Sequence, residues 1–259
     1  MIVDSHCHLN LLSQADYPEG VDAIIDSARR AGVSAFLCVG IDAQSSRRAI
    51  QLAEQYDRVY ASVGVHPSAS ADEGVDDSLI ALAHNASVVA IGETGLDYHY
   101  DGPDLEQMQM RFRAHIRLAR QLNKPLIIHT RAAKADTIKI MEQERAMDVG
   151  GVMHCFTEDL EMAEQAMAMG FYISFSGILT FKNADTLKKV AAVIPMERIL
   201  IETDTPYLAP VPYRGKPNKP EYVGLVAEQV AVLRSCSVET VIKQTTDNFY
   251  QLFKDAKPL

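Results

Sequence analysis

Val88-Val89-Ala90-Ile91-Gly92-Glu93 is a short apolar run that ends in a carboxylate, and Pro125-Leu126-Ile127-Ile128-His129 repeats the pattern with a histidine. Runs that are apolar throughout are typical of parallel strands whose two faces are both buried. Between these runs, apolar residues recur at intervals of three and four, the spacing of one helix face: Leu105, Met108, Phe112, Ile116 and Ala119. Residues 88–129 therefore predict a strand–helix–strand unit of a parallel sheet.

The same alternation extends along the whole chain. The expected strands cover eight apolar runs, at residues 2–3, 35–39, 59–65, 88–91, 125–128, 151–153, 171–175 and 199–201. Helical spacing is found over residues 20–30, 46–56, 104–122, 159–169, 184–193, 221–234 and 238–254. This α/β alternation, at roughly 32 residues per unit, predicts a (β/α)8 TIM barrel as a single domain over residues 1–259. The alternative is an open doubly wound sheet, although no G-x-G-x-x-G follows an early strand.

The composition excludes several classes of protein. Of the 259 residues, 47% are hydrophobic, which excludes a largely disordered chain. No apolar run approaches the ~18 residues of a membrane span and no signal peptide is recognisable, so we expect a cytoplasmic protein without a membrane partner. The four cysteines form no CxxC, which favours reduced thiols. The net charge of −9 argues against non-specific wrapping of nucleic acid, but it leaves room for a nuclease with local cations.

Polar side chains follow the expected strands. In a TIM barrel the carboxyl ends of the strands meet at one face, where active sites lie. His6 and His8 stand two residues apart, so in an extended chain their side chains point the same way. The other candidates follow later strands: His66, Glu93, His129, His154, Glu202 and Asp204. Imidazole and carboxylate together suit zinc, manganese, iron or magnesium, so the sequence predicts a metal site.

The remaining histidines and two of the cysteines are interpreted as structural. His84 and His115 lie in helical segments and His99 in a loop, so we expect them to be solvated or packed rather than metal-bound. Cys7 and Cys155 neighbour candidate ligands, but strand alternation points both thiols away from the expected site. We therefore expect them to pack in the core.

Several blocks of the sequence resemble the signature regions of TatD-type metal-dependent deoxyribonucleases. They are MIVDSHCHL at 1–9, GETGLDY at 92–98 and IETDTPYL at 201–208. The stretches KPLIIHTR at 124–131 and HCF at 154–156 also match that family, in its order and spacing. The resemblance implies an amidohydrolase-like barrel that binds one or two divalent ions, with Mg, Mn and Zn all open.

The resemblance also implies a ligand set. His6, His8, Glu93 and Asp204 would hold one ion, and Glu93, His129 and His154 would hold the second, so that Glu93 bridges the pair. Such ions activate water at neutral pH. Asp204 and Glu93 are the expected catalytic residues, with Asp204 placed to take the proton from water. Asp97 and Glu202 are expected to orient ligands, although the sequence leaves Glu202 open as a proton acceptor.

The expected substrate contacts lie mainly in a proline-rich loop after the last strand. Residues 211–220 contain one arginine, two lysines and no acid, a basic island in an acidic chain. We expect Tyr213 to stack on a base, and Arg214 and Lys216 to contact phosphate, although the loop is alternatively only a rigid connection. His66 and Arg131 are further candidates for phosphate contact.

Three classes of function remain open from the sequence. The preferred one is a nuclease that cleaves DNA phosphodiester bonds at ends or in single strands. The second is a related barrel hydrolase that acts on ester or amide bonds, such as an aminoacyl-tRNA deacylase, because its ligands would be nearly identical. The third is a non-enzymatic metal-binding protein. The candidate base Asp204 argues against this class, because a purely structural metal site would be closed. The oligomeric state leaves no signal in the sequence.

Overall fold

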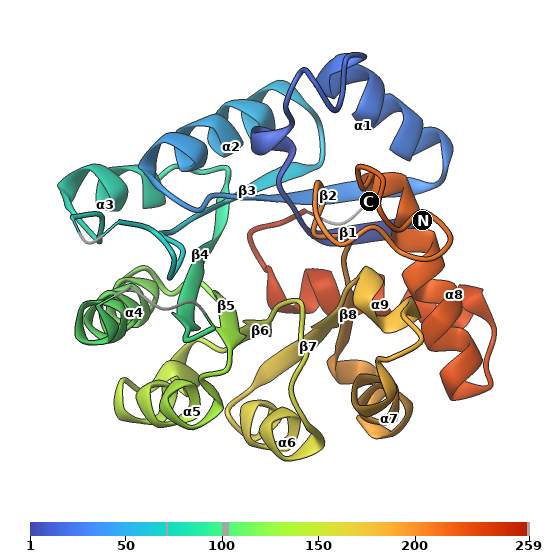
Figure 1. Ribbon diagram of the computed structural model, residues 1–259. Helices are drawn as coiled ribbons and strands as arrows, with labels where there is room; N and C mark the ends of the chain where they lie inside the picture. Colours follow the sequence, from blue (N-terminus) through green and yellow to red (C-terminus); the bar gives the residue numbers. More distant parts are fainter. Residues whose placement is uncertain (71, 100–103, 258–259) are drawn as a thin grey trace.

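A computed structural model describes residues 1–70, 72–99 and 104–257 (Figure 1). Within these residues, eight parallel strands form one sheet in which each strand pairs with the next along the chain. The strands are β1 (Ile2–Cys7), β2 (Val33–Val39), β3 (Val59–Val63), β4 (Val88–Asp97), β5 (Leu126–Arg131), β6 (Gly151–Met153), β7 (Phe171–Phe175) and β8 (Ile199–Ile201). The predicted TIM barrel is confirmed, and the open doubly wound sheet was the wrong alternative.

The helices lie around the ring of strands, except the last, which lies across one end of it (Figure 1). They are α1 (Gly20–Arg30), α2 (Ala43–Gln55), α3 (Asp77–Ala83), α4 (Leu105–Leu122), α5 (Lys134–Gln143), α6 (Leu160–Ala168), α7 (Asp185–Val193), α8 (Val223–Arg234) and α9 (Val238–Leu252). Short 3-10 helices are η1 (Leu9–Leu11), η2 (Ala146–Asp148), η3 (Gly177–Thr180), η4 (Met196–Arg198) and η5 (Pro220–Tyr222). Among the described residues, none of the helices is both long enough and apolar enough to span a membrane.

Several elements differ from the sequence prediction, among them β1 and β5, which run on to Cys7 and Arg131. Helices α3 and α5 were missed, because α3 has only seven residues and the apolar spacing of α5 is weak. Strand β4 runs to Asp97 instead of ending at Ile91, so Glu93 lies within this strand rather than after it. A register shift in the β4–β5 ladder between Ile91 and Thr94 accompanies this extension.

The first and last strands meet through hydrogen bonds near their carboxyl ends. The backbone N–H of Asp204 donates to His6 O at 3.0 Å, and the N–H of His8 donates to Thr205 O at 2.7 Å. The buried carboxylate of Asp4 accepts from both the backbone and the hydroxyl of Thr203, at 2.9 and 2.6 Å. These contacts bring the segment after β8 against β1 and nearly close the barrel.

The core lies on both sides of the sheet. One large cluster fills the space between strands and helices. In a second cluster, Phe249 and Phe253 pack with residues near the amino-terminal ends of the strands, among them Val3, Val89 and Ile127. The C-terminal helix α9 therefore covers the amino-terminal end of the barrel, which leaves the carboxyl ends of the strands for the polar residues.

Candidate metal centre and active site

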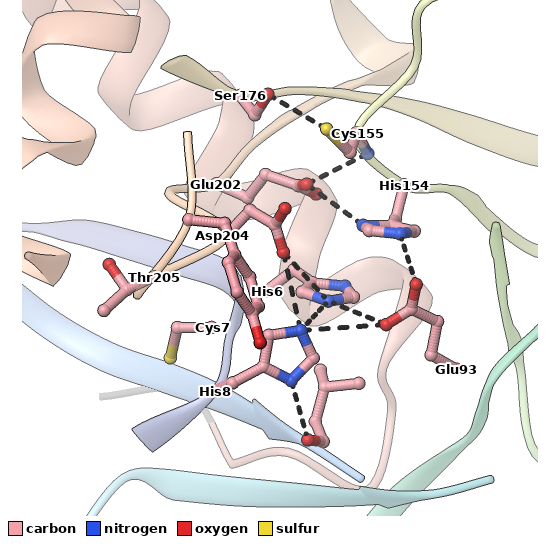
Figure 2. A network of polar contacts seen from close by, with 12 residues as sticks. His6, Cys7, His8, Glu93, His154, Cys155, Ser176, Glu202, Asp204 and Thr205 are labelled. Carbon is pink, nitrogen blue, oxygen red and sulfur yellow. Dashed lines mark hydrogen bonds and ion pairs between the residues drawn. The ribbon is translucent and has the colours of Figure 1, made fainter. Parts of the chain in front are cut away.

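His6 and His8 present their rings to the same point at the carboxyl end of β1. Both residues are buried, and their Nε2 atoms lie 3.2 Å apart (Figure 2). Nδ1 of His8 lies 3.0 Å from Val39 O, and because a carbonyl only accepts, the proton of His8 is on Nδ1. The Nε2 lone pair of His8 therefore faces the site. As predicted, Cys7 points the other way, and its thiol donates to Leu37 O.

Glu93 lies between two groups of imidazoles. Its Oε2 is 3.4 Å from His6 Nε2 and 3.7 Å from His8 Nε2. Its Oε1 is 2.8 Å from His154 Nε2 and 3.2 Å from His129 Nδ1. Burial raises the pKa of Glu93, but the neighbouring imidazoles outweigh that effect and hold it well below its usual value. The carboxylate therefore turns one oxygen toward each group, as a ligand shared by two ions would.

In the first group, His6 and His8 lie at ligand spacing from one another and from two carboxylates. Oδ1 of Asp204 lies 3.4 Å from His8 Nε2 and 3.7 Å from His6 Nε2. Four ligand atoms at 2.0–2.2 Å from a tetrahedral ion would be about 3.3–3.6 Å apart. The Nε2 atoms of His6 and His8 lie 3.2 to 3.7 Å from each other and from the Glu93 and Asp204 oxygens. Carboxylates only accept hydrogen bonds, so oxygens and imidazole lone pairs that converge in this way fit a divalent cation.

The second group contains one histidine more than expected. His129 and His154 approach Oε1 of Glu93 as described, and His66 Nε2 also lies 3.4 Å from this oxygen. The sequence placed His66 among the candidates that follow the strands, but the resemblance left it outside the ligand set, and we expected it to contact phosphate. The N–H of Val65 donates to His115 Nε2 at 3.0 Å, and the Arg111 guanidinium donates to His66 O at 3.1 Å. Helix α4 therefore holds the β3 loop, and with it His66, beside the second group.

Two carboxylates contact the far sides of the ligand imidazoles. Asp97 Oδ2 lies 3.2 Å from His129 Nε2, and Glu202 Oε1 lies 3.2 Å from His154 Nδ1. Burial lowers the pKa of His154, but Glu93 and Glu202 outweigh it and raise the pKa well above the usual value. Carboxylates in such positions orient metal-binding imidazoles and fix their tautomer.

A cavity of about 580 Å³ opens above these donors. Its lining includes members of both groups together with Arg131, Ser68, Thr157, Ile178, Tyr207 and Leu208. The volume lies within the range of small-molecule sites, about 300–1,000 Å³. The structure therefore brings five of the six predicted ligands and Arg131 to one pocket, and the sixth, His6, is buried beside them.

The expected contacts from the proline-rich loop are not brought to this cavity. Tyr213 stacks on Tyr222, with ring centroids 4.2 Å apart, and the guanidinium of Arg214 lies 4.0 Å from the ring centroid of Phe181. In the part of the chain that the structure describes, neither of them nor the exposed Lys216 belongs to the cavity lining. The loop turns its basic side chains outward, because its own aromatic contacts and the buried Asn218 determine its path.

Sequence reasoning did not assign several residues of the cavity, among them Tyr207 and Cys155. Tyr207 is 53% exposed at the cavity, three residues after Asp204, and its place after β8 could have revealed it. Cys155 was expected in the core, but it lies on the cavity wall with its thiol 3.1 Å from Ser176 Oγ. That expectation was wrong because β6 ends at Met153, and Cys155 has a φ of 42°, so strand alternation no longer applies.

The three histidines that we expected to be solvated or packed are either buried or exposed. His115 is fully buried, and its Nδ1–H donates to Arg111 O at 2.8 Å, besides the contact with Val65. His84 is exposed at the end of α3, and His99 is exposed after β4. His115 is therefore packed in the core, and the other two histidines lie at the surface.

Comparison with known proteins adds independent evidence. The family model described as TatD related DNase matches residues 3–254. YcfH of Escherichia coli K12, named as an uncharacterized metal-dependent hydrolase, is 46% identical over 252 residues, which cover 97% of this chain and 95% of YcfH. TatD of Erwinia tasmaniensis, named as a 3′-5′ ssDNA/RNA exonuclease, is 33% identical over 250 residues, with 93% and 96% covered.

A solved structure gives the same result. The crystal structure of YJJV, a TatD homologue from Escherichia coli K12, matches this fold with a TM-score of 0.89 at 28% identity, over 98% of both chains. These matches over nearly the full length agree with the barrel fold and with the converging donor atoms. The chain belongs to the TatD-related DNase family of metal-dependent hydrolases.

Proposed function

We propose that this protein is a nuclease that hydrolyses phosphodiester bonds at the ends of single-stranded DNA. The observation that carries the proposal is the position of Glu93, which turns one oxygen toward each of two donor groups on the floor of an open cavity. Sites of this kind suit phosphodiester hydrolysis, because two cations stabilise both the attacking and the leaving oxygen. The exonuclease name of the Erwinia relative supports this choice of substrate.

In this proposal the ligand set is the one that the family resemblance implies. His6, His8, Glu93 and Asp204 hold one ion, and Glu93, His129 and His154 hold the second. When bound, such ions supply Lewis acidity that makes water a nucleophile at neutral pH and stabilises charge on the phosphoryl group. The distances among the donor atoms support this assignment.

Asp204 is the proposed proton acceptor. Its side chain lies at the cavity wall beside His8. Burial raises the pKa of Asp204, but the hydrogen bond with His8 and the charges of His6 and His154 outweigh it, so the pKa is lowered. A carboxylate that stays ionised at neutral pH can accept a proton from water. His66 and Arg131, which line the same cavity, are the proposed contacts to the phosphodiester.

An activity panel on metal-reconstituted protein tests the proposal. End-labelled single-stranded DNA, duplex DNA, RNA and simple carboxylic esters are compared, each with a Glu93→Ala preparation as control for contaminating nucleases. We expect single strands to be shortened from one end, with activity lost in Glu93→Ala and after chelation. Glu93-dependent ester cleavage without cleavage of any nucleic acid would instead identify the related ester or amide hydrolase.

We also propose one domain over residues 1–259 and a cytoplasmic location. The uninterrupted strand order and the match to residues 3–254 support a single domain. All four cysteines are free thiols, as is usual in reducing compartments. A stable proteolytic fragment that contains only part of the barrel, or recovery of the protein outside the cytoplasm, would contradict these assignments.

A further inference from the structure

Tyr207 is an exposed aromatic residue at the edge of the candidate active site. Its ring centroid lies 6.1 Å from that of His8, with the planes inclined by 68°. Together with Leu208 and Ile178, it belongs to the lining of the cavity that contains the donor residues. Since about half of Tyr207 is exposed, at 53%, much of its surface is open to a ligand. Tyr207, Leu208 and Ile178 therefore form an apolar wall beside the polar floor of the cavity.

The backbone fixes Tyr207 relative to the candidate ligands. The N–H of Tyr207 donates to Asp204 O at 2.8 Å, which forms a tight turn directly after the proposed base. The buried side chain of Asn218 donates both to Tyr207 O and, at 2.8 Å, to Thr203 O. The segment that carries the ring is therefore held on both sides, and the ring stands at a defined place beside the donors.

We propose that Tyr207 is the stacking surface for the base of the nucleotide whose phosphodiester is cleaved. The proposal rests on the proposed nuclease function and deepens it. A nucleotide joins an anionic phosphate to a flat aromatic base, and the cavity joins a cation-binding floor to an exposed aromatic wall. Stacking on tyrosine accepts any base, because every base has a π face. It also favours single strands, because bases in a duplex are already stacked and paired.

The structure separates Tyr207 from the other tyrosine that the sequence had suggested for this role. The rings of Tyr213 and Tyr222 are nearly parallel, with an angle of 4° between planes and centroids 4.2 Å apart. One face of Tyr213 is therefore already occupied by a ring of the same protein. Stacking at Tyr207 and stacking at Tyr213 would therefore give different results in the same experiment.

The chain contains no tryptophan, which allows a direct binding test. In Tyr207→Trp and Tyr213→Trp the new side chain is the sole indole, and its emission reports on stacking. Each Mg²⁺-loaded variant is titrated with thymidine 5′-monophosphate and with deoxyribose 5-phosphate, which lacks the base. We expect quenching only in Tyr207→Trp and only by the nucleotide, with circular dichroism spectra that match the wild type.

Several outcomes would overturn the proposal. They are quenching at position 213 instead of 207, equal quenching by both ligands, and no quenching at 207 while calorimetry shows that the nucleotide binds. Failure of the wild-type protein to bind the nucleotide at all would also overturn it, since the ring would then have no base to bind.

Kinetics on single-stranded oligonucleotides provide the second test. Tyr207→Ala is expected to raise KM at least about 5-fold, with a smaller effect on kcat, because the base is bound in ground and transition states alike. Tyr207→Phe keeps the ring and should restore most of the affinity. If Phe is as poor as Ala, the hydroxyl rather than the ring face is what matters, and stacking is rejected. If the wild type cleaves no oligonucleotide, the nuclease proposal fails, whereas the fluorescence titration still decides the stacking proposal.

Discussion

Asp97 Oδ2 lies 3.2 Å from His129 Nε2, on the opposite side of the ring from Glu93, whose Oε1 lies 3.2 Å from Nδ1. Both carboxylates only accept, so the Nε2–H of His129 donates to Asp97, and a cation bound beside Glu93 would take the place of a proton on Nδ1. Burial raises the pKa of Asp97, but the hydrogen bonds from His129 and from the backbone N–H of His99, with the charge of His129, together outweigh it, so the pKa is lowered. Asp97 therefore prepares His129 to bind a cation.

Replacing Asp97 should weaken metal binding without removing a proposed ligand. We expect Asp97→Ala to lower the affinity for Zn²⁺ about 10- to 100-fold, the usual effect of losing such an outer carboxylate. Competition with a chromophoric chelator measures this affinity. The matched control is Asp136→Ala, since Asp136 contacts the Tyr98 hydroxyl at 3.0 Å rather than a histidine. Equal affinities in the two variants would contradict the role of Asp97.

Glu93 should be the ligand on which both ions depend. We expect Glu93→Gln to reduce the number of tightly bound ions per chain, because an amide carries no charge to offset the repulsion between two cations. Metal analysis by mass spectrometry after desalting provides the count. Glu144→Gln is the isosteric control, because Glu144 pairs with Arg117 at 2.8 Å on the surface. An unchanged ion count in Glu93→Gln would rule out the bridging assignment.

The barrel and the donor groups could be predicted because they depend on local pattern and one topological rule. Strand runs such as 125–128 are apolar throughout, and helical spacing separates them, which restricts the fold to a parallel sheet. Once the strands form a barrel, the residues at their carboxyl ends must converge. His6, Glu93 and His154 come from strands far apart in sequence, yet the rule places them together.

The substrate side of the site could not be predicted in the same way, because loops follow tertiary contacts. The sequence pointed to Tyr213 and Arg214, since aromatic and basic residues in a loop are typical of phosphate or base contacts. In the structure these side chains pack on Tyr222 and Phe181, and Tyr207 stands at the cavity instead. No local sequence pattern predicts which of these tyrosines a neighbouring ring will cover.

Replacing the proposed base should separate chemistry from metal binding. Asp204→Asn keeps one carbonyl oxygen as a ligand but cannot accept a proton, so we expect kcat to fall about 100- to 10,000-fold. Turnover of single-stranded DNA is measured on samples whose metal content has been matched to the wild type. Near-wild-type turnover with metal bound would show that another group, with Glu202 as the first candidate, takes the proton.

His115 should make the stability of the fold depend on pH. Burial lowers its pKa from 6.5 to about 4. Between these values the unfolded chain binds more protons than the folded one, so this stabilising contribution is complete above about pH 6.5 and is lost as the pH falls toward 4. Over this pH range, the shift lowers the free energy of unfolding by about 3 kcal/mol.

The measurement is the pH dependence of denaturant unfolding between pH 7 and 4.5. We expect His115→Gln to show a shallower loss of stability with acidity than the wild type, whereas substitution of the exposed His84 by Gln should leave the slope as it is. A wild-type slope in His115→Gln would mean that other groups govern the acid sensitivity.

Gly95 should be indispensable to the close approach of β4 and β5. The ladder places Gly95 opposite His129, and a Cβ on Gly95 would lie 1.9 Å from His129 O. Gly95 also has a φ of 141°, which side chains rarely adopt. Because the obstructing atom is backbone, we expect Gly95→Ala to destabilise the fold by about 2–3 kcal/mol and to lower Tm by about 4–12 °C.

Gly74→Ala provides the matched control, because a Cβ there would meet no atom within 4 Å. Its stability should stay within about 0.5 kcal/mol of the wild type. Since the clash in Gly95→Ala pushes β5 away at His129, that variant should also bind Zn²⁺ more weakly, even when assayed well below its own Tm. A Gly95→Ala protein with the melting temperature and zinc affinity of Gly74→Ala would show that the two strands can separate at this point without moving the ligand.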